Sequence, residues 1–256
     1  MGHERVGHLP KTQRWREIVA NIVPAATANE QIARLTADTI EKVKDRYTNI
    51  YNDQGVKAAF QFLLALSVSH KNPKETISFN VSLNDAPSTL QIVKALGDWM
   101  RPRIESHEYA TLARKAAADT IAHWTREHSK QRDLFGTESN PSRVWASAGS
   151  SAGFCQVTRI FFSNFTKRYL RYFLEREASA ELSTVAERRQ FNERLVRHVD
   201  EVSQHAFEIA KITQSFAAGW YAKHAEQHLP SDKEIGGFLA VAFGKMQEEL
   251  LKESLP

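Results

Sequence analysis

FFSNFTKRYLRYFLERE, residues 161–177, places six aromatic side chains and several cations within about five helical turns. At about 100° per residue, a helix gathers the aromatic residues into one arc of about 120°, and Lys167, Arg168 and Arg171 fall on another. Single-stranded nucleic acid needs aromatic and basic groups side by side. The segregation instead predicts a packed aromatic face, within a bundle or at a subunit interface, and a narrow basic stripe. The aromatic arc consists of Phe161, Phe162, Phe165, Tyr169, Tyr172 and Phe173.

The rest of the chain favours the same fold class. Apolar residues recur at three- and four-residue spacing through long segments that contain no proline, which predicts helices. Ser88 with Gln91, and Ser231 with Glu234, fit the capping box of a helix start. We therefore predict an all-α bundle of about eight helices. They cover 12–22, 29–51, 54–70, 88–104, 106–130, 152–178, 185–228 and 232–253.

The longest predicted helix, 185–228, carries a sustained apolar seam. Such a seam packs lengthwise against other helices at a shallow crossing angle. The neighbours lie within this chain or in a second subunit, so a homo-oligomer stays open, and the several other amphipathic helices favour the first. The seam consists of Leu195, Val202, Ile209 and Phe216 at seven-residue spacing, interleaved with Val199, Ala206, Thr213 and Trp220.

We predict a single all-α domain over residues 1–256. The segment 131–151, QRDLFGTESNPSRVWASAGSS, is the weakest in helical pattern and predicts a loop. If the domain is subdivided, this loop joins an N-terminal helical half, 1–130, to a C-terminal helical half, 152–256.

One segment, ETISFNVSLN at 75–84, departs from helical periodicity. Its apolar residues alternate with polar ones, as in a half-buried strand, and the chain offers no second strand of this kind. Pairing with the sheet edge of a partner protein is one interpretation. An extended connector that covers the bundle is the other. The candidate partner contacts are Ile77, Phe79, Val81 and Leu83.

The composition indicates in which cellular compartment the protein works and which classes of partner it can bind. The single cysteine, Cys155, excludes an intramolecular disulfide. The first twenty residues carry charges where a signal peptide needs an apolar core, and no later apolar run approaches the length of a membrane span. We expect a soluble cytoplasmic protein without a membrane partner. A net charge of +4, from 34 basic and 30 acidic residues, permits a nucleic-acid partner without requiring one. The candidate phosphate contacts are Arg5, Lys11, Arg14 and Arg16 in an N-terminal arm, with Lys167, Arg168 and Arg171.

Two sequence motifs resemble catalytic motifs, but neither has the surrounding structure that its chemistry requires. Gly149-Ser150-Ser151-Ala152-Gly153 has the letters of a nucleophile elbow, but that motif needs a strand and a parallel sheet, so we interpret it as a helix start. Arg101 and His107 have the arginine–histidine spacing of the HEPN ribonucleases, yet Pro102 interrupts their helix.

Cofactor and metal signals are equally weak. His224 and His228 are four residues apart but have no third ligand at a recognisable spacing. The chain contains no phosphate-binding glycine loop. We therefore predict no cofactor, no metal and no catalytic residue.

Three stretches carry a resemblance: GHLPKTQRW at 7–15, RYLRYFLERE at 168–177 and FAAGWYAK at 216–223. In this order they resemble a set of short uncharacterised bacterial proteins that are associated with antiphage defence operons. The resemblance implies an accessory subunit of a larger machine and assigns no site residue. Our leading hypothesis is a non-enzymatic helical subunit or adaptor of a multi-protein assembly. The alternatives are a nucleic-acid-binding module and a HEPN-like ribonuclease.

Overall fold

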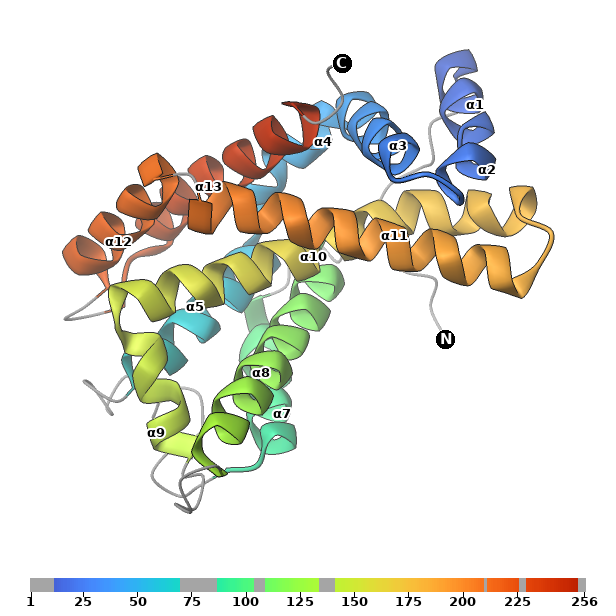
Figure 1. The fold of residues 1–256 in the computed structure, drawn as a ribbon. Coiled ribbons are helices and arrows are strands. Elements are labelled where there is room, and N and C mark those ends of the chain that lie inside the picture. Colours follow the sequence, from blue (N-terminus) through green and yellow to red (C-terminus); the bar gives the residue numbers. More distant parts are fainter. Residues whose placement is uncertain are drawn as a thin grey trace.

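The computed structural model of the chain describes residues 12–69, 87–103, 109–133, 141–209, 211–225 and 229–252. In these ranges all regular secondary structure is helical, which confirms the predicted all-α class (Figure 1). The α-helices are α1 (Gln13–Ala20), α2 (Ile22–Ala25), α3 (Asn29–Lys42), α4 (Lys44–Asn49), α5 (Gln54–Val68), α7 (Thr89–Met100), α8 (Ala110–Asp133), α9 (Pro141–Ala146), α10 (Ser151–Glu181), α11 (Val185–Gln204), α12 (Lys211–His224) and α13 (Asp232–Lys252). The short 3₁₀ segments are η1 (Ile50–Asn52), η3 (Arg101–Arg103) and η4 (Ser147–Gly149), and η5 (His205–Ile209) is π-helical.

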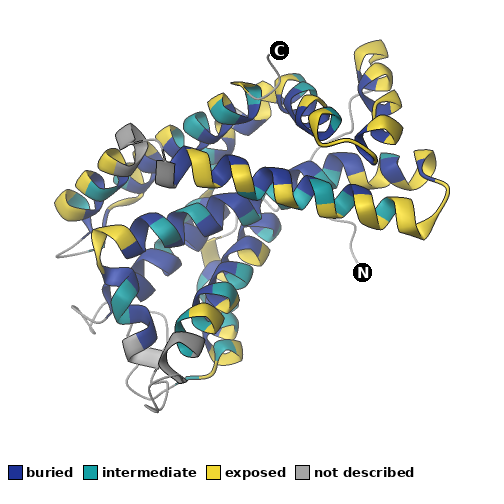
Figure 2. Ribbon diagram, in the orientation of Figure 1, coloured by how far each residue is buried: buried dark blue, intermediate teal, exposed yellow. Residues whose placement is uncertain are grey.

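Helix α10 organises the fold. It crosses the middle of the molecule in Figure 1, with α11 alongside it and α8 against another side. The predicted aromatic face packs inside this chain, because five of its six aromatic side chains are fully buried and Tyr172 is partly buried. Phe162 contacts Phe243 of α13 at a ring distance of 4.7 Å, and Tyr169 contacts Tyr47 of α4 at 5.3 Å. Figure 2 shows the buried class concentrated on α5 and α10.

The aromatic core contains a buried pair of hydroxyl groups. The Tyr47 hydroxyl and the Thr166 hydroxyl lie 2.8 Å apart and form a hydrogen bond between α4 and α10. Burial raises the pKa of Tyr47 well above its ordinary value, so the hydroxyl keeps its proton for this bond.

Two of the long predicted helices are divided in the structure. The first, 29–51, is interrupted at Val43, whose backbone leaves the helical region (φ −106°, ψ 18°) and separates α3 from α4. The second, 185–228, is divided by the π-helical η5. A π-turn holds one more residue than an α-turn, so it rotates the following side chains by about 100°. The seam is buried at Leu195 and Val202 before η5, but Phe216 beyond it is 36% exposed.

The segment predicted as the connecting loop is partly helical. Within 131–151, residues 141–149 form α9 and η4. Trp145 is fully buried, and the Trp124 indole Nε1 of α8 donates to the Val144 carbonyl at 3.1 Å. The same buried core includes residues from both sides of this segment.

None of the helices in the described ranges is both long enough and apolar enough to cross a membrane. The predicted strand segment, with Ile77, Phe79, Val81 and Leu83, lies outside the described residues.

Candidate binding groove

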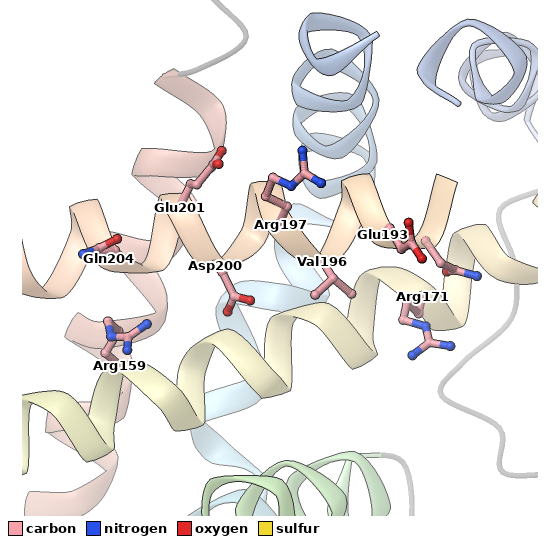
Figure 3. Close-up of a pocket in the computed structure, with 9 residues that line it drawn as sticks. Arg159, Arg171, Glu193, Val196, Arg197, Asp200, Glu201 and Gln204 are labelled. Atoms are coloured by element: carbon pink, nitrogen blue, oxygen red, sulfur yellow. The ribbon is translucent and has the colours of Figure 1, made fainter. Parts of the chain in front are cut away.

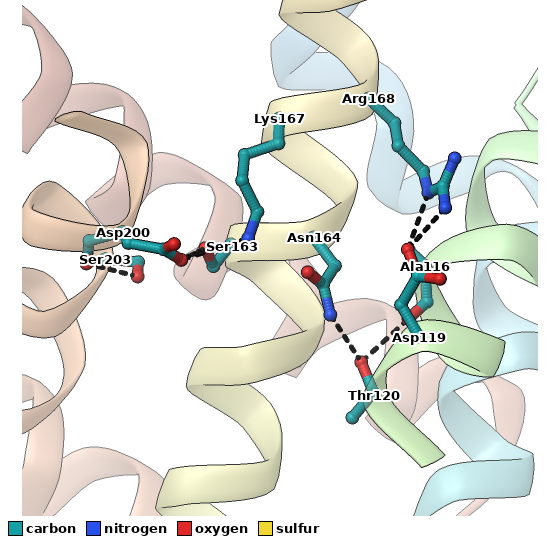
Figure 4. Close-up of polar contacts among 9 residues, drawn as sticks. All are labelled: Ala116, Asp119, Thr120, Ser163, Asn164, Lys167, Arg168, Asp200 and Ser203. Atoms are coloured by element: carbon teal, nitrogen blue, oxygen red, sulfur yellow. Dashed lines mark hydrogen bonds and ion pairs between the residues drawn. The ribbon is translucent and has the colours of Figure 1, made fainter. Parts of the chain in front are cut away.

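Each of the three cations in the basic stripe of α10 forms an ion pair with a carboxylate. Lys167 Nζ lies 3.1 Å from Asp200 Oδ1 of α11, and Arg168 Nε donates to Asp119 Oδ2 of α8 at 3.0 Å (Figure 4). Arg171 Nη2 donates to Glu175 Oε1 at 3.0 Å on α10 itself. These three cations therefore join α10 to its neighbours or to its own next turn.

The other predicted phosphate contacts are scattered. Arg14 of α1 pairs with Glu41 of α3 at 2.5 Å, and Arg16 is exposed. Arg5 and Lys11 lie outside the described residues. The structure thus shows no convergence of the seven candidates within its described part, and their role in phosphate binding stays a prediction.

The glycine-rich motif at 149–153 forms a helix start. Ser150 is the N-cap of α10, and its hydroxyl accepts the Gly153 backbone N–H at 3.0 Å. A Cβ at Gly153 would lie 2.0 Å from the Ser147 carbonyl oxygen, so this turn requires glycine for close backbone contact. The motif therefore has a packing role in this fold.

The remaining catalytic and metal candidates do not come together. The Arg101 side chain is 80% exposed and pairs with Asp98 at 3.0 Å, while His107 lies outside the described residues. His224 Nδ1 lies 2.8 Å from Glu234 Oε1, and His228 is also outside. Hydrogen bonds from Ser231, reinforced by His224, lower the pKa of Glu234 to about 2. Among the described residues, no group of three or more potential ligands could hold a metal ion.

An open groove of about 570 Å³ runs along α11 beside α10 (Figure 3). Residues four apart on a helix share a face, so α11 contributes two adjacent lines of side chains. From the first to the last of them, the groove follows α11 for about 18 Å. It is lined by Arg159 and Arg171 of α10, and by Asn192, Glu193, Val196, Arg197, Asp200, Glu201 and Gln204 of α11.

The groove carries both signs of charge. The wall from α10 contributes arginines, whereas three of the four ionised side chains on the α11 wall are carboxylates. Figure 3 shows Val196 and Asp200 pointing toward α10, while Arg197 and Glu201 project from the other edge of α11. Within the described part of the chain, Arg197 and Glu201 form no ion pair. These two rim charges are therefore available to a ligand.

Two buried polar atoms in the groove have no hydrogen-bond partner in the part of the chain that the structure describes. One is the Arg171 Nε, a donor, and the other is the Asn192 Oδ1, an acceptor. Buried polar groups in folded proteins are nearly always hydrogen-bonded. Each atom is closed off by its neighbours, so a ligand in the groove cannot reach it without a rearrangement.

Sequence reasoning missed most of this groove. Only Arg171 was among the predicted contacts, and Asn192, Val196 and Arg197 were not singled out. A usable signal is present, because Asn192, Val196, Asp200 and Gln204 follow a four-residue spacing beside the apolar seam.

Comparison of this chain with protein-family models, with curated proteins and with solved structures returns no match. The resemblance to bacterial defence-operon proteins therefore stays a prediction.

Proposed function

We propose that this protein is a non-enzymatic helical subunit or adaptor that binds a partner protein through the groove between α10 and α11. The observation that carries the proposal is the mixed charge of this open groove, whose rim residues Arg197 and Glu201 form no ion pair within the described residues. Protein surfaces offer hydrogen-bond donors, acceptors and charges of both signs. The groove fits such a ligand along its length.

The distribution of charge favours a protein over a polyanion. A nucleic acid needs cations that are free to neutralise successive phosphates. Here Lys167 and Arg168 are held by Asp200 and Asp119, and carboxylates share the groove with its arginines. Figure 3 shows Arg159 and Arg171 toward opposite ends of the groove, which suits an elongated ligand rather than a compact anion.

The resemblance of residues 7–15, 168–177 and 216–223 to bacterial defence-operon proteins supports the setting that we propose. An accessory subunit of an antiphage assembly needs a surface for its neighbour and no reaction centre of its own. We propose that the groove is this surface.

The experiment is affinity purification at native expression, followed by mass spectrometry, with two charge-reversal variants. Arg197→Glu changes the rim of the groove, and Lys233→Glu makes the same change at an exposed position in the first turn of α13. We expect one protein to copurify reciprocally with the wild type and with Lys233→Glu. Its recovery should fall about tenfold with Arg197→Glu, because rim charges govern association.

Two outcomes would count against the proposal. One is a wild-type protein that is recovered alone, at the 29.1 kDa of a single chain. The other is a partner whose recovery is the same with both variants.

A further inference from the structure

We infer that a second copy of this chain docks on the outer face of α13 and forms an antiparallel two-fold dimer. The inference goes beyond the proposed function and uses a different surface, because the residues that line the groove belong to α10 and α11. The outer face consists of Lys233, Gly237, Ala240, Val241, Gly244 and Glu248.

The outer face is a continuous strip that the rest of the chain leaves uncovered. At about 100° per residue, its members fall within an arc of about 100°, and all of them are exposed or partly exposed. The opposite side of α13 carries Met246 and Leu250, which are fully buried. Val241 is 39% exposed. A Cβ at Gly237 or Gly244 would meet no atom within 4 Å outside the local helix backbone and the two chain neighbours. The middle of the face is therefore apolar and open.

Helix α12 extends this apolar surface. Phe216 of α12 stacks on Phe238 of α13 with the ring centroids 5.8 Å apart. Phe238 lies three residues before Val241, so Phe216 borders the outer face. Phe216 and Val241 are two of the five large apolar side chains that are exposed in the described part of the chain. Exposed apolar side chains that gather on one surface are typical of interaction sites.

The residues of the outer face are arranged symmetrically along the helix. From Lys233 to Glu248 the steps between them are four, three, one, three and four residues, which read the same in both directions. Two antiparallel copies related by a two-fold axis between Ala240 and Val241 therefore place each member opposite another member. Gly237 lies opposite Gly244 of the second copy, Ala240 opposite Val241, and Lys233 opposite Glu248.

The charges at the ends of the face select the antiparallel direction. An antiparallel dimer pairs Lys233 with Glu248 at both ends, whereas a parallel dimer would set like charges against each other. Within the described residues Lys233 forms no ion pair. Glu248 pairs with Lys245, yet its side chain is 53% exposed and can accept a second cation. The dipoles of two antiparallel helices also attract, because each N-terminus lies beside a C-terminus.

The size of the contact sets its strength. The two glycine pairs let the helix axes approach to about 8 Å, the lower end of the usual range. The face is about 22 Å long, from Lys233 to Glu248, and one helix wide. This area is small for a permanent dimer, so we expect a dissociation constant of about 1–100 μM.

The first test measures the mass of the full chain by sedimentation from about 1 μM to about 300 μM, a range that brackets this constant. We expect the mass to rise from 29.1 kDa toward twice that value. Lys233→Glu should weaken the dimer at least about tenfold, because it opposes two carboxylates at each end. Combining Lys233→Glu with Glu248→Lys should restore it, since the exchanged charges attract again. A carboxylate suits the first turn of a helix, so Lys233→Glu should fold normally.

A second pair of variants tests the close approach of the helices. Gly237→Leu should leave the fold intact, because the position is exposed, and should abolish the dimer by holding the helices apart. Gly97→Leu on α7 is the matched control, since a Cβ there is equally free of contacts. Thermal melts followed by circular dichroism verify the fold of each variant.

The direction of the helices is tested with single cysteines, because the natural Cys155 is buried. In the antiparallel dimer the two copies of position 241 meet at the axis, whereas the two copies of position 237 are about 10 Å apart along it. Val241→Cys should therefore oxidise to a linked dimer, and Gly237→Cys should not.

Three outcomes would overturn the inference. They are a mass that stays at 29.1 kDa over the whole range, a dimer that Lys233→Glu and Gly237→Leu leave unchanged, and a disulfide that forms as readily at position 237 as at position 241. The proposed function is tested separately, because recovery of the groove partner should respond to Arg197→Glu and not to Lys233→Glu.

Discussion

Lys167 of α10 and Asp200 of α11, which lines the groove, form an ion pair with Nζ 3.1 Å from Oδ1. The same carboxylate oxygen accepts the hydroxyl of Ser163, which is buried. The Lys167 side chain is 16% exposed, so its ammonium depends on this one carboxylate more than a surface lysine would. The pair therefore fixes the two helices that form the groove.

Replacing Asp200 with asparagine should destabilise the fold. The variant keeps the shape of the side chain but leaves the ammonium of Lys167 largely buried without its counter-charge. Because Asp200 itself is half-exposed, we expect a moderate loss in the free energy of unfolding, about 1–2 kcal/mol. Urea denaturation measures it. Glu248→Gln, which breaks an exposed pair with Lys245 on α13, should cost less than about 0.5 kcal/mol. Equal losses in the two variants would show that the α10–α11 pair has no special weight.

Alanine substitutions at two helical glycines should have opposite effects. At Gly153 a Cβ would meet the backbone of Ser147, so Gly153→Ala should destabilise the start of α10 by about 1–3 kcal/mol. At Gly219, in α12, no atom outside the local helix backbone and the two chain neighbours lies within 4 Å of the new Cβ. Gly219→Ala should therefore raise the free energy of unfolding by about 0.5–1 kcal/mol, since alanine restricts the unfolded chain. Thermal and urea unfolding give both signs, and a stabilising Gly153→Ala would refute the packing role of the motif.

The sequence could predict the features that local geometry determines. The aromatic arc of α10 follows from helical angles alone, and so does the separate arc that holds Lys167 and Arg168. Their partners, Asp200 and Asp119, are 33 and 49 residues away in the chain, and no local pattern relates them. The stripe could therefore be located from the sequence, but its neutralisation within the fold could not.

The interruptions of the long helices are a second feature that the sequence could not predict. The apolar seam of 185–228 continues at seven-residue spacing through η5, so periodicity gives no sign of the π-helical turn. Phe207 in η5 stacks on Phe162 of α10 at 5.3 Å, and this contact joins segments that no local pattern relates. Tertiary contacts of this kind override a local pattern.

Acid should weaken the fold through His198. Burial lowers the pKa of His198 to about 4, from 6.5 in a free histidine. The unfolded chain takes up this proton below pH 6.5, whereas the folded chain resists it until about pH 4. The stability that neutral His198 provides is thus complete above pH 6.5 and declines between 6.5 and about 4. Between about pH 7.5 and about pH 5 the loss should be roughly 2 kcal/mol.

A variant without an ionisable group at position 198 isolates this effect. His198→Gln should lose less stability than the wild type over the same pH range, because other groups titrate in both proteins and only His198 differs. Urea denaturation at the two pH values gives the four free energies that are needed. Parallel pH profiles for the two proteins would rule out His198 as the source.

Asn192→Leu should separate stability from binding. The Asn192 Oδ1 is buried without a hydrogen-bond partner in the described part of the chain, and such an orphaned acceptor costs about 1–3 kcal/mol. Leucine has a similar size and no polar atom, so the isolated variant should be at least as stable as the wild type, and up to about 1 kcal/mol more stable. Its recovery of the partner should be unchanged, because the buried Oδ1 is out of reach of a ligand in the groove.

The matched control is Asn164→Leu on α10, where the same substitution removes a side chain that already has a partner. The Asn164 amide donates to Thr120 Oγ1 of α8 at 3.4 Å, outside the groove. This variant should lose about 0.5–1 kcal/mol of unfolding free energy and keep its partner. If Asn192→Leu were the less stable of the two, Asn192 would stabilise the packing between α10 and α11. The reverse order would show that the orphaned acceptor costs the fold stability.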